Sequence, residues 1–243
     1  MKTIKFLALI MTLFFTAIQL NAQFENNCDS DCENPIITSD TVHFYHPLFP
    51  TCKIIASYSV RRCPDGRVEI ITRGVGYGSG PECSGLAVWL QTAGFEFTNH
   101  DDLWIMAYRA ASEKDFQKRY NLLLSVNQGF LIECPNGYET YEMHRAQCVK
   151  FCTYNDAIGT MMWYQQITCN SSACCIFKRK ICFNTTTQQM EVTETRMQTN
   201  QGANCTSATT SCPLTMQIQL PGILMPRTGI FAGFETDCNV PCD

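Results

Sequence analysis

The chain has 243 residues, of which 45% are hydrophobic, and its formal net charge is −4 at pH 7. This length suits one large domain or two small ones, and this apolar content is enough to bury a substantial core. A mildly acidic chain has no electrostatic attraction for nucleic acid or anionic lipid, so we expect neither as a partner.

The first 22 residues have the three-part order of a secretory signal peptide. Lys2 and Lys5 form a basic start, residues 6–18 are apolar, and Ala22 is the small residue that signal peptidase needs. We predict cleavage between Ala22 and Gln23, because a retained membrane anchor needs about 20 apolar residues. No later segment is apolar enough to span a bilayer. The mature protein is therefore expected to be secreted or held in a cell envelope, in the periplasm or on the outer surface of a bacterium.

Residues 53–73 predict a β-hairpin. Apolar and polar side chains alternate from Ile54 to Arg61 and again from Val68 to Thr72, which is the period of two that strands show. Between these runs, residues 64–66 read Pro-Asp-Gly, a typical turn sequence.

Glycines follow this hairpin at every second position from 74 to 80. Phosphate-binding loops need other glycine spacings and a helix start, and neither is present. An esterase elbow fails because Tyr77 occupies the first glycine position of that motif around Ser79. We interpret the stretch as a strand tail or loop with one bare face, closely approached by another backbone or by a partner of Tyr77.

Residues 101–127 change to a helical period. Asp101 is a candidate N-cap, Ser112 with Asp115 resembles a capping box, and Gly129 suits a helix stop. We predict one broken helix or two short ones, amphipathic and packed on a sheet, with Trp104 and Met106 in the core.

From Cys134 onward the sequence is again typical of strands. Residues 174–198 repeat the order seen in 52–73: cysteine, strand, cysteine, turn and returning strand. This suggests two related hairpin units. Three Asn-x-Ser/Thr triplets, which accept glycans only in a eukaryotic secretory route, are interpreted as polar turns at Asn170, Asn184 and Asn204.

The expected fold class is α+β, with disulfide-rich antiparallel β-hairpin units and a central amphipathic helical segment. After a signal peptide at 1–22, we expect an N-terminal hairpin-plus-helix unit at 23–130. A C-terminal cysteine-rich β unit is expected at 131–243, unless the two units form one continuous domain.

An even number of cysteines in an exported chain predicts a disulfide framework of unassigned connectivity. Zinc motifs with paired ligand spacing are absent, as is the C-x-x-C of redox enzymes. Cys174 and Cys175 are interpreted as structural, because neighbouring strand residues point to opposite faces and can bond two different partners. The cysteines are Cys28, Cys32, Cys52, Cys63, Cys83, Cys134, Cys148, Cys152, Cys169, Cys174, Cys175, Cys182, Cys205, Cys212, Cys238 and Cys242.

Candidate acid–base groups are few. His43 and His46 are interpreted as loop histidines before Pro47, His100 lies at the expected helix start, and His144 alternates with Glu142 in an expected strand. A Cys–His nucleophile is disfavoured because an oxidised sulfur cannot attack. We therefore assign no catalytic residue, no metal ligand and no cofactor.

Two basic clusters lie on the first strands of the two hairpins. They are candidate binding residues for acidic groups, although charges on strands also protect sheet edges from aggregation. The residues are Arg61, Arg62, Lys178, Arg179 and Lys180.

Together these patterns predict a non-catalytic exported protein, stabilised by disulfides, for surface attachment, matrix or partner binding. The partner is expected to be extracellular or on a cell surface. The alternative is a secreted hydrolase with a site of scattered residues that lack a local motif. A cleft that gathers His43, His46 or His100 with carboxylates would favour the hydrolase.

Overall fold

The computed structural model describes residues 28, 32–94, 96–169, 174–198, 205, 210–218 and 227–239. The expected signal peptide, with its cleavage point between Ala22 and Gln23, lies outside the described residues, as do Asn170 and Asn204. Across the described ranges, no helix is both long and apolar enough to cross a membrane.

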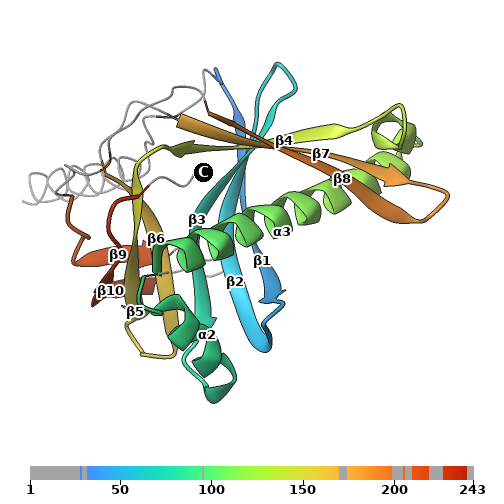
Figure 1. Cartoon of the computed structure of the whole chain (residues 1–243). Helices are drawn as coiled ribbons and strands as arrows, with labels where there is room; N and C mark the ends of the chain where they lie inside the picture. Colours follow the sequence, from blue (N-terminus) through green and yellow to red (C-terminus); the bar gives the residue numbers. More distant parts are fainter. Residues whose placement is uncertain are drawn as a thin grey trace, which may run out of the picture.

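The chain forms a ten-stranded sheet with one long helix lying across it (Figure 1). The elements are β1 (Ile36–His46), β2 (Phe49–Arg62), β3 (Val68–Gly78), η2 (Pro81–Cys83), α2 (Ser84–Leu90), α3 (Glu96–Ser125), η3 (Gly129–Ile132), β4 (Glu139–Ala146), β5 (Val149–Asp156), β6 (Met161–Thr168), β7 (Cys174–Asn184), β8 (Gln189–Gln198), β9 (Thr215–Ile218) and β10 (Arg227–Glu235). The fold is thus α+β, mostly β-sheet.

The sheet forks at β3. One edge of β3 pairs antiparallel with β2, which in turn pairs with β1. Along its other edge, Val68 and Glu69 pair in parallel with β4, whereas Val75 to Gly78 pair antiparallel with β6. One arm then continues through β7 to β8 and the other through β5 and β10 to β9. In Figure 1 the arm of β5, β9 and β10 lies to the left, and the β7–β8 hairpin crosses over the top of β3 and reaches to the far right.

The predicted hairpin at 53–73 is confirmed as β2 and β3. Its turn follows the expected chemistry, since Gly66 has a φ of 87° and the Asp65 carboxylate accepts the Arg67 backbone N–H at 3.1 Å. Glycine adopts this positive φ without the steric cost that a side chain would bring. The strand-like segments after Cys134 are also confirmed, as β4 to β8.

The glycine-rich stretch continues β3 as far as Gly78. Its bare face is covered by Trp163 of β6, which pairs with Gly76. A Cβ placed on Gly76 would lie 2.7 Å from two ring carbons of Trp163. The close neighbour of this glycine face is therefore an indole ring.

The helix prediction needs correction. α3 is one continuous helix of 30 residues that begins at Glu96, so neither Asp101 nor Ser112 with Asp115 caps a helix start. An amphipathic helix is not confirmed, because almost every side chain from Asn99 to Ile105 is buried. Only in the C-terminal half of α3 do the buried side chains form a single stripe along one face of the helix.

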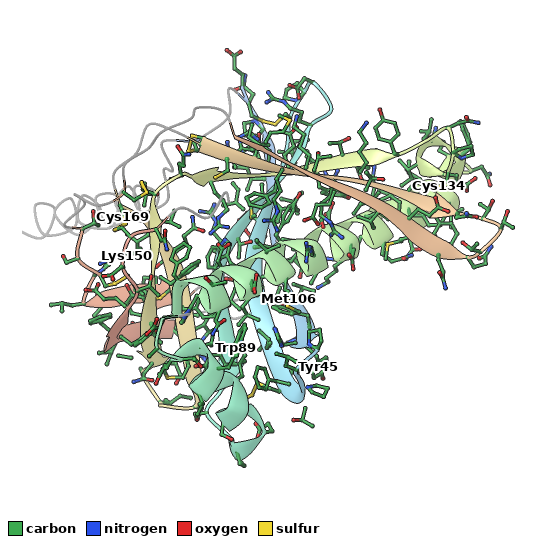
Figure 2. All side chains as sticks on the ribbon, viewed as in Figure 1. Tyr45, Trp89, Met106, Cys134, Lys150 and Cys169 are labelled. Atoms are coloured by element: carbon green, nitrogen blue, oxygen red, sulfur yellow. A yellow bond between two sulfur atoms is a disulfide. The ribbon has the colours of Figure 1, made fainter. Side chains whose placement is uncertain are left out.

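The core fills the space between α3 and the sheet, and Figure 2 shows side chains crowded there. Trp104 is buried in this core, and Met106 is partly buried against it, as predicted. The segment expected as a histidine loop is instead strand β1, with a bulge between Tyr45 and His46.

The fold is rich in disulfides. Cys174 bonds to Cys28, and Cys175 is also disulfide-bonded, so the two neighbours do not bond each other. The described bridges are Cys28–Cys174, Cys32–Cys63, Cys52–Cys83, Cys134–Cys182, Cys148–Cys205, Cys152–Cys212 and Cys169–Cys238. Cys242 lies outside the described residues.

The bridge pattern does not repeat between the two hairpins. Cys83 returns to Cys52 in its own hairpin, whereas Cys205 bonds to Cys148 beside β5. The two hairpin units have the same order of strands, but their disulfide cross-links differ.

Candidate binding groove

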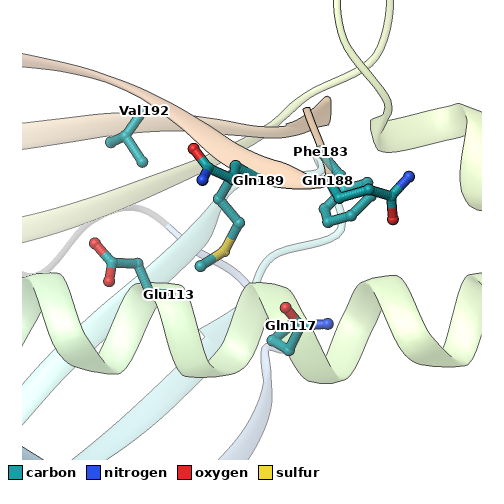
Figure 3. A pocket seen from close by; sticks show the side chains of 7 residues that line it. Glu113, Gln117, Phe183, Gln188, Gln189 and Val192 are labelled. Atoms are coloured by element: carbon teal, nitrogen blue, oxygen red, sulfur yellow. The ribbon is translucent and has the colours of Figure 1, made fainter. Parts of the chain in front are cut away.

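A hollow of about 430 Å³ lies between α3 and the β7–β8 hairpin (Figure 3). We name it the α3–β8 groove. Figure 3 shows Glu113 and Gln117 on the helix and the other labelled side chains on the hairpin. Its lining residues are Glu113, Gln117, Phe183, Gln188, Gln189, Met190 and Val192.

The groove lies between α3 and the β8 residues that face the helix. Side chains of β8 alternate between its two faces, and Glu194 reaches α3 through an ion pair with Arg109. Val192 and Met190 therefore lie on the same face as Glu194, two and four residues away. Val192 remains 40% exposed because the helix does not cover it.

Aromatic and apolar groups form the inner wall. The Phe183 ring stacks on Tyr120 of α3, with 4.3 Å between ring centroids. Tyr120 is itself buried, and its hydroxyl donates to Glu133 at 3.1 Å. This stack fixes the position of Phe183 and leaves the rest of the wall to Met190 and Val192.

Side-chain amides supply most of the polar lining. Gln117 donates an N–H to Asn121 at 3.1 Å, and Gln188 donates one to the Thr185 carbonyl at 2.6 Å. Their amide oxygens have no described hydrogen bond and can accept one from a ligand. The groove thus offers uncharged acceptors beside an apolar wall.

Ion pairs under the hairpin hold it against the helix. Arg179 of β7 donates to Ser112 at 2.6 Å and to Glu113 at 2.7 Å. Arg109 donates twice to Glu194 of β8, at 2.9 and 2.8 Å. These hydrogen bonds from Arg109 lower the pKa of Glu194, so the carboxylate stays ionised at neutral pH. The groove is therefore preformed.

A bridge and a polar turn complete this support. Cys134, just after η3, bonds to Cys182 of β7. In the turn beyond β7, the Asn184 carboxamide oxygen accepts the backbone N–H groups of Thr186 and Thr187 at 2.9 and 3.1 Å. Asn184 therefore acts as a turn former, consistent with its interpretation from sequence.

The candidate basic residues all have partners within the chain. Arg62 pairs with Asp115 at 2.5 Å and with Glu139 at 3.0 Å, and Arg61 lies 3.4 Å from Glu69. These arginines join β2 to α3, β3 and β4. Their placement gives no support to a patch for acidic ligands.

The second basic cluster is used in the same way. Lys178 pairs with Glu142 at 2.7 Å, Arg179 makes the helix contacts already described, and Lys180 lies over the Tyr138 ring at 4.7 Å. Of these, only Arg179 touches the groove, through Glu113.

The histidines lie apart from the groove. His46 is buried against Phe49 and Trp89, and burial lowers its pKa. Its Nδ1 accepts the Leu48 backbone N–H at 3.1 Å. His144 lies 2.9 Å from Glu142, with which it was predicted to alternate in a strand.

His100 is 2% exposed near the start of α3. Its ring stacks between Phe151 and Phe234, with centroids 5.6 and 5.7 Å away, and Nδ1–H donates to the Glu96 carbonyl at 2.7 Å. Burial lowers its pKa to about 4. It is a neutral component of the core at physiological pH.

Among the described residues, three clusters combine two cysteines with a glutamate, at Glu69, Glu191 and Glu235. In each cluster the two sulfurs are joined in a disulfide. A metal-binding sulfur is a thiolate, so these clusters do not offer the donors of a cysteine metal site.

Comparison of the chain with protein-family models, curated proteins and solved structures found no match. The groove residues were also missed by sequence reasoning. The one local signal is the Gln188-Gln189 pair after a threonine turn, and Glu113 and Gln117 join it only through the tertiary fold.

Proposed function

We propose that this is a non-catalytic, disulfide-stabilised protein that acts outside the cytoplasm by binding a partner in the α3–β8 groove. Surface attachment and matrix binding are the settings in which it would serve. The observation that carries this proposal is the groove itself, a hollow of about 430 Å³ with apolar and amide walls.

The groove has the general properties of a recognition site. Ligand pockets combine apolar walls with a few fixed polar groups, and volumes of roughly 300–1,000 Å³ are usual. Here Met190 and Val192 supply the apolar wall, while Gln117 and Gln188 supply acceptors held by their own hydrogen bonds. The hydrogen bonds of Arg109 and Arg179 preform the groove, and a preformed site loses less conformational entropy when a partner binds.

The disulfides support an extracellular setting. Such frameworks persist in oxidising compartments and are rare in the cytosol. They also make a rigid support possible for the groove, because Cys134–Cys182 fixes β7 beside η3.

Hydrolysis needs more groups than the groove provides. General acid–base chemistry uses a positioned acid and base, and among the described residues of the lining only Glu113 is ionisable. That carboxylate already accepts a hydrogen bond from Arg179 at 2.7 Å. The chemistry of the lining therefore favours binding over the hydrolase alternative.

Photo-crosslinking in the native host tests the proposal. A benzophenone amino acid placed at Val192 should give a discrete adduct with a partner, because this side chain lies in the groove. The matched control is the same amino acid at Val88, an exposed valine on α2. Equal adducts at the two positions would contradict the groove as the binding site. A folded Glu113→Gln variant that lost a measured hydrolytic activity would favour the enzyme.

A further inference from the structure

Three strands form edges of the described sheet: β1, β8 and β9. An edge strand has backbone N–H and C=O groups without a strand partner, so it is a template for pairing with another chain. Natural proteins usually protect long edges by covering them, shortening them or placing charges and bulges on them. The three edges differ in this respect.

β1 and β9 are protected. Lys114 of α3 donates to the Thr41 backbone carbonyl, and Lys114 and Lys118 both pair with Asp40 of β1. Although burial alone would raise it, these lysines lower the pKa of Asp40 to about 2. β9 is only four residues long.

β8 is long, no described strand pairs with its outer edge, and its charged residues are Glu191, Glu194 and Arg196. Its ten residues pair with β7 in an unbroken register, from Gln189 opposite Asn184 to Gln198 opposite Cys175. It contains no proline, glycine or lysine. The residues from Glu191 to Thr193 and from Thr195 to Met197 are exposed. The α3–β8 groove lies directly beneath this edge, because Gln189, Met190 and Val192 belong to both.

We propose that β8 accepts an extended peptide segment of a partner protein as an additional strand, with the groove receiving side chains of that segment. This inference deepens the proposed function and rests on it. Strand addition supplies backbone hydrogen bonds for affinity, and adjoining pockets for alternate side chains supply specificity.

The charges of the edge define the peptide. Glu191 lies near the turn end of β8, and Arg196 lies near the other end. Opposite charges across paired strands are favourable and like charges are unfavourable. The peptide should therefore carry Lys or Arg opposite Glu191 and an acidic residue opposite Arg196. It should place an aliphatic residue beside Val192.

These charges also disfavour a second copy of the chain as the occupant. Glu191 and Arg196 are five residues apart, so they lie on opposite faces of β8. When β8 pairs antiparallel with a second copy of itself about a twofold axis, residues directly opposite each other lie on the same face of the sheet. Glu191 of one copy therefore cannot lie opposite Arg196 of the other. Among the acidic residues of β8, Arg196 can face only Glu194 of the other copy, in the register centred on Thr195, and that carboxylate already accepts two hydrogen bonds from Arg109 of its own chain.

The test uses the full-length native protein and a displayed library of random dodecapeptides. The selected peptide should show the predicted charges and bind one per chain. Val192→Lys should weaken binding by about tenfold or more, whereas Val88→Lys should leave it within about twofold. Each variant should keep the wild-type near-ultraviolet circular dichroism.

Backbone methylation isolates strand addition from groove binding. In a paired strand, alternate N–H groups face the neighbouring strand. N-methylation of one alternate set in the peptide should lower affinity by about tenfold or more, and methylation of the other set should have little effect. On binding, amide hydrogen exchange should slow along β8.

Three results would overturn the inference. If both methylated peptides bind as well as the parent while Val192→Lys still abolishes binding, the groove binds ligand without strand addition, and the proposed function stands. If no selected peptide responds to Val192→Lys, both proposals fall. If amide hydrogen exchange along β8 slows only when the protein dimerises at higher concentration, the occupant is a second copy of the chain.

Discussion

Gly76 shows how one missing side chain sets the packing of two strands. A Cβ at this position would lie 2.7 Å from Trp163 ring carbons, whereas a Cβ at Gly74 would lie 3.6 Å from the same ring. Gly76→Ala should therefore destabilise the protein by about 1–3 kcal/mol, the usual cost of overpacking. Gly74→Ala should cost less than about 1 kcal/mol. Chemical denaturation with the disulfides intact measures both. Equal costs would show that the Trp163 contact does not constrain Gly76.

His100 provides a second prediction at this scale, concerning pH. Its folded pKa is about 4, below the ordinary 6.5, so the unfolded state binds a proton first as the pH falls. As the pH falls from 6.5 to 4, this residue should therefore lower the free energy of unfolding by about 1.4 kcal/mol for each pH unit. Above pH 6.5 it contributes no pH dependence.

His100→Phe would retain the stack with Phe151 and Phe234 and remove the titration. The variant should lose less stability than the wild type between pH 7 and pH 4.5, measured by urea unfolding at each pH. Carboxylates titrate in both proteins, so the difference isolates His100. Parallel pH profiles would show that the folded protein does not exclude the imidazolium.

The long helix is positioned by buried ion pairs as well as by apolar packing. Arg145 of β4, 1% exposed in its side chain, donates to Asp101 of α3 at 2.5 Å. Removing one partner of such a pair leaves an uncompensated buried charge, which typically costs about 3–5 kcal/mol. Arg145→Met should therefore be strongly destabilising. Asp101→Leu combined with Arg145→Met should recover most of the loss, because replacing both partners with apolar groups is often neutral. Thermal unfolding of the single and double variants gives the coupling, and additive losses would contradict it.

These ion pairs also explain which elements could be predicted from sequence. The β2–β3 hairpin depends on alternation and a Pro-Asp-Gly turn, and both signals are local. The bounds of α3 depend on partners far along the chain. Asp101 resembles an N-cap in sequence, and only the fold brings Arg145 to it. The same holds for Asp115, which pairs with Arg62.

At the scale of the whole molecule, the disulfide framework gives a chemical prediction. Every described cysteine is disulfide-bonded, and the Cys28–Cys174 bridge joins residues that are 146 positions apart. A loop of this length is worth about 5 kcal/mol in the chain-entropy model. Maleimide labelling of the native protein in denaturant without reductant should give almost no adduct, and labelling after reduction should give one per cysteine. Two or more adducts before reduction would contradict a fully oxidised framework.

The groove could not be predicted from sequence either, because residues far apart in the chain form its two walls. Its helix wall comes from Glu113 and Gln117, and its sheet wall lies some 70 residues later in the chain (residues 183–192). Neither segment has a motif, and their meeting depends on the β7–β8 hairpin crossing α3. Disulfide connectivity was open for the same reason, since spacing along the chain does not specify distance in space.

The fork at β3 has a consequence for the order in which the structure opens and closes. This one strand pairs with β2 along one edge and with both β4 and β6 along the other. Either outer arm can separate while the β1–β2–β3 meander stays intact, but β3 cannot open without releasing both arms. Local opening is cheapest where few contacts are lost. The β3 amides that are hydrogen-bonded to β2, β4 or β6 should therefore exchange with solvent only when the entire molecule unfolds, and those of β8 and β9 should exchange sooner. Native-state hydrogen exchange would show this hierarchy, and fast exchange in β3 would mean that the two arms are held together by something other than their shared strand.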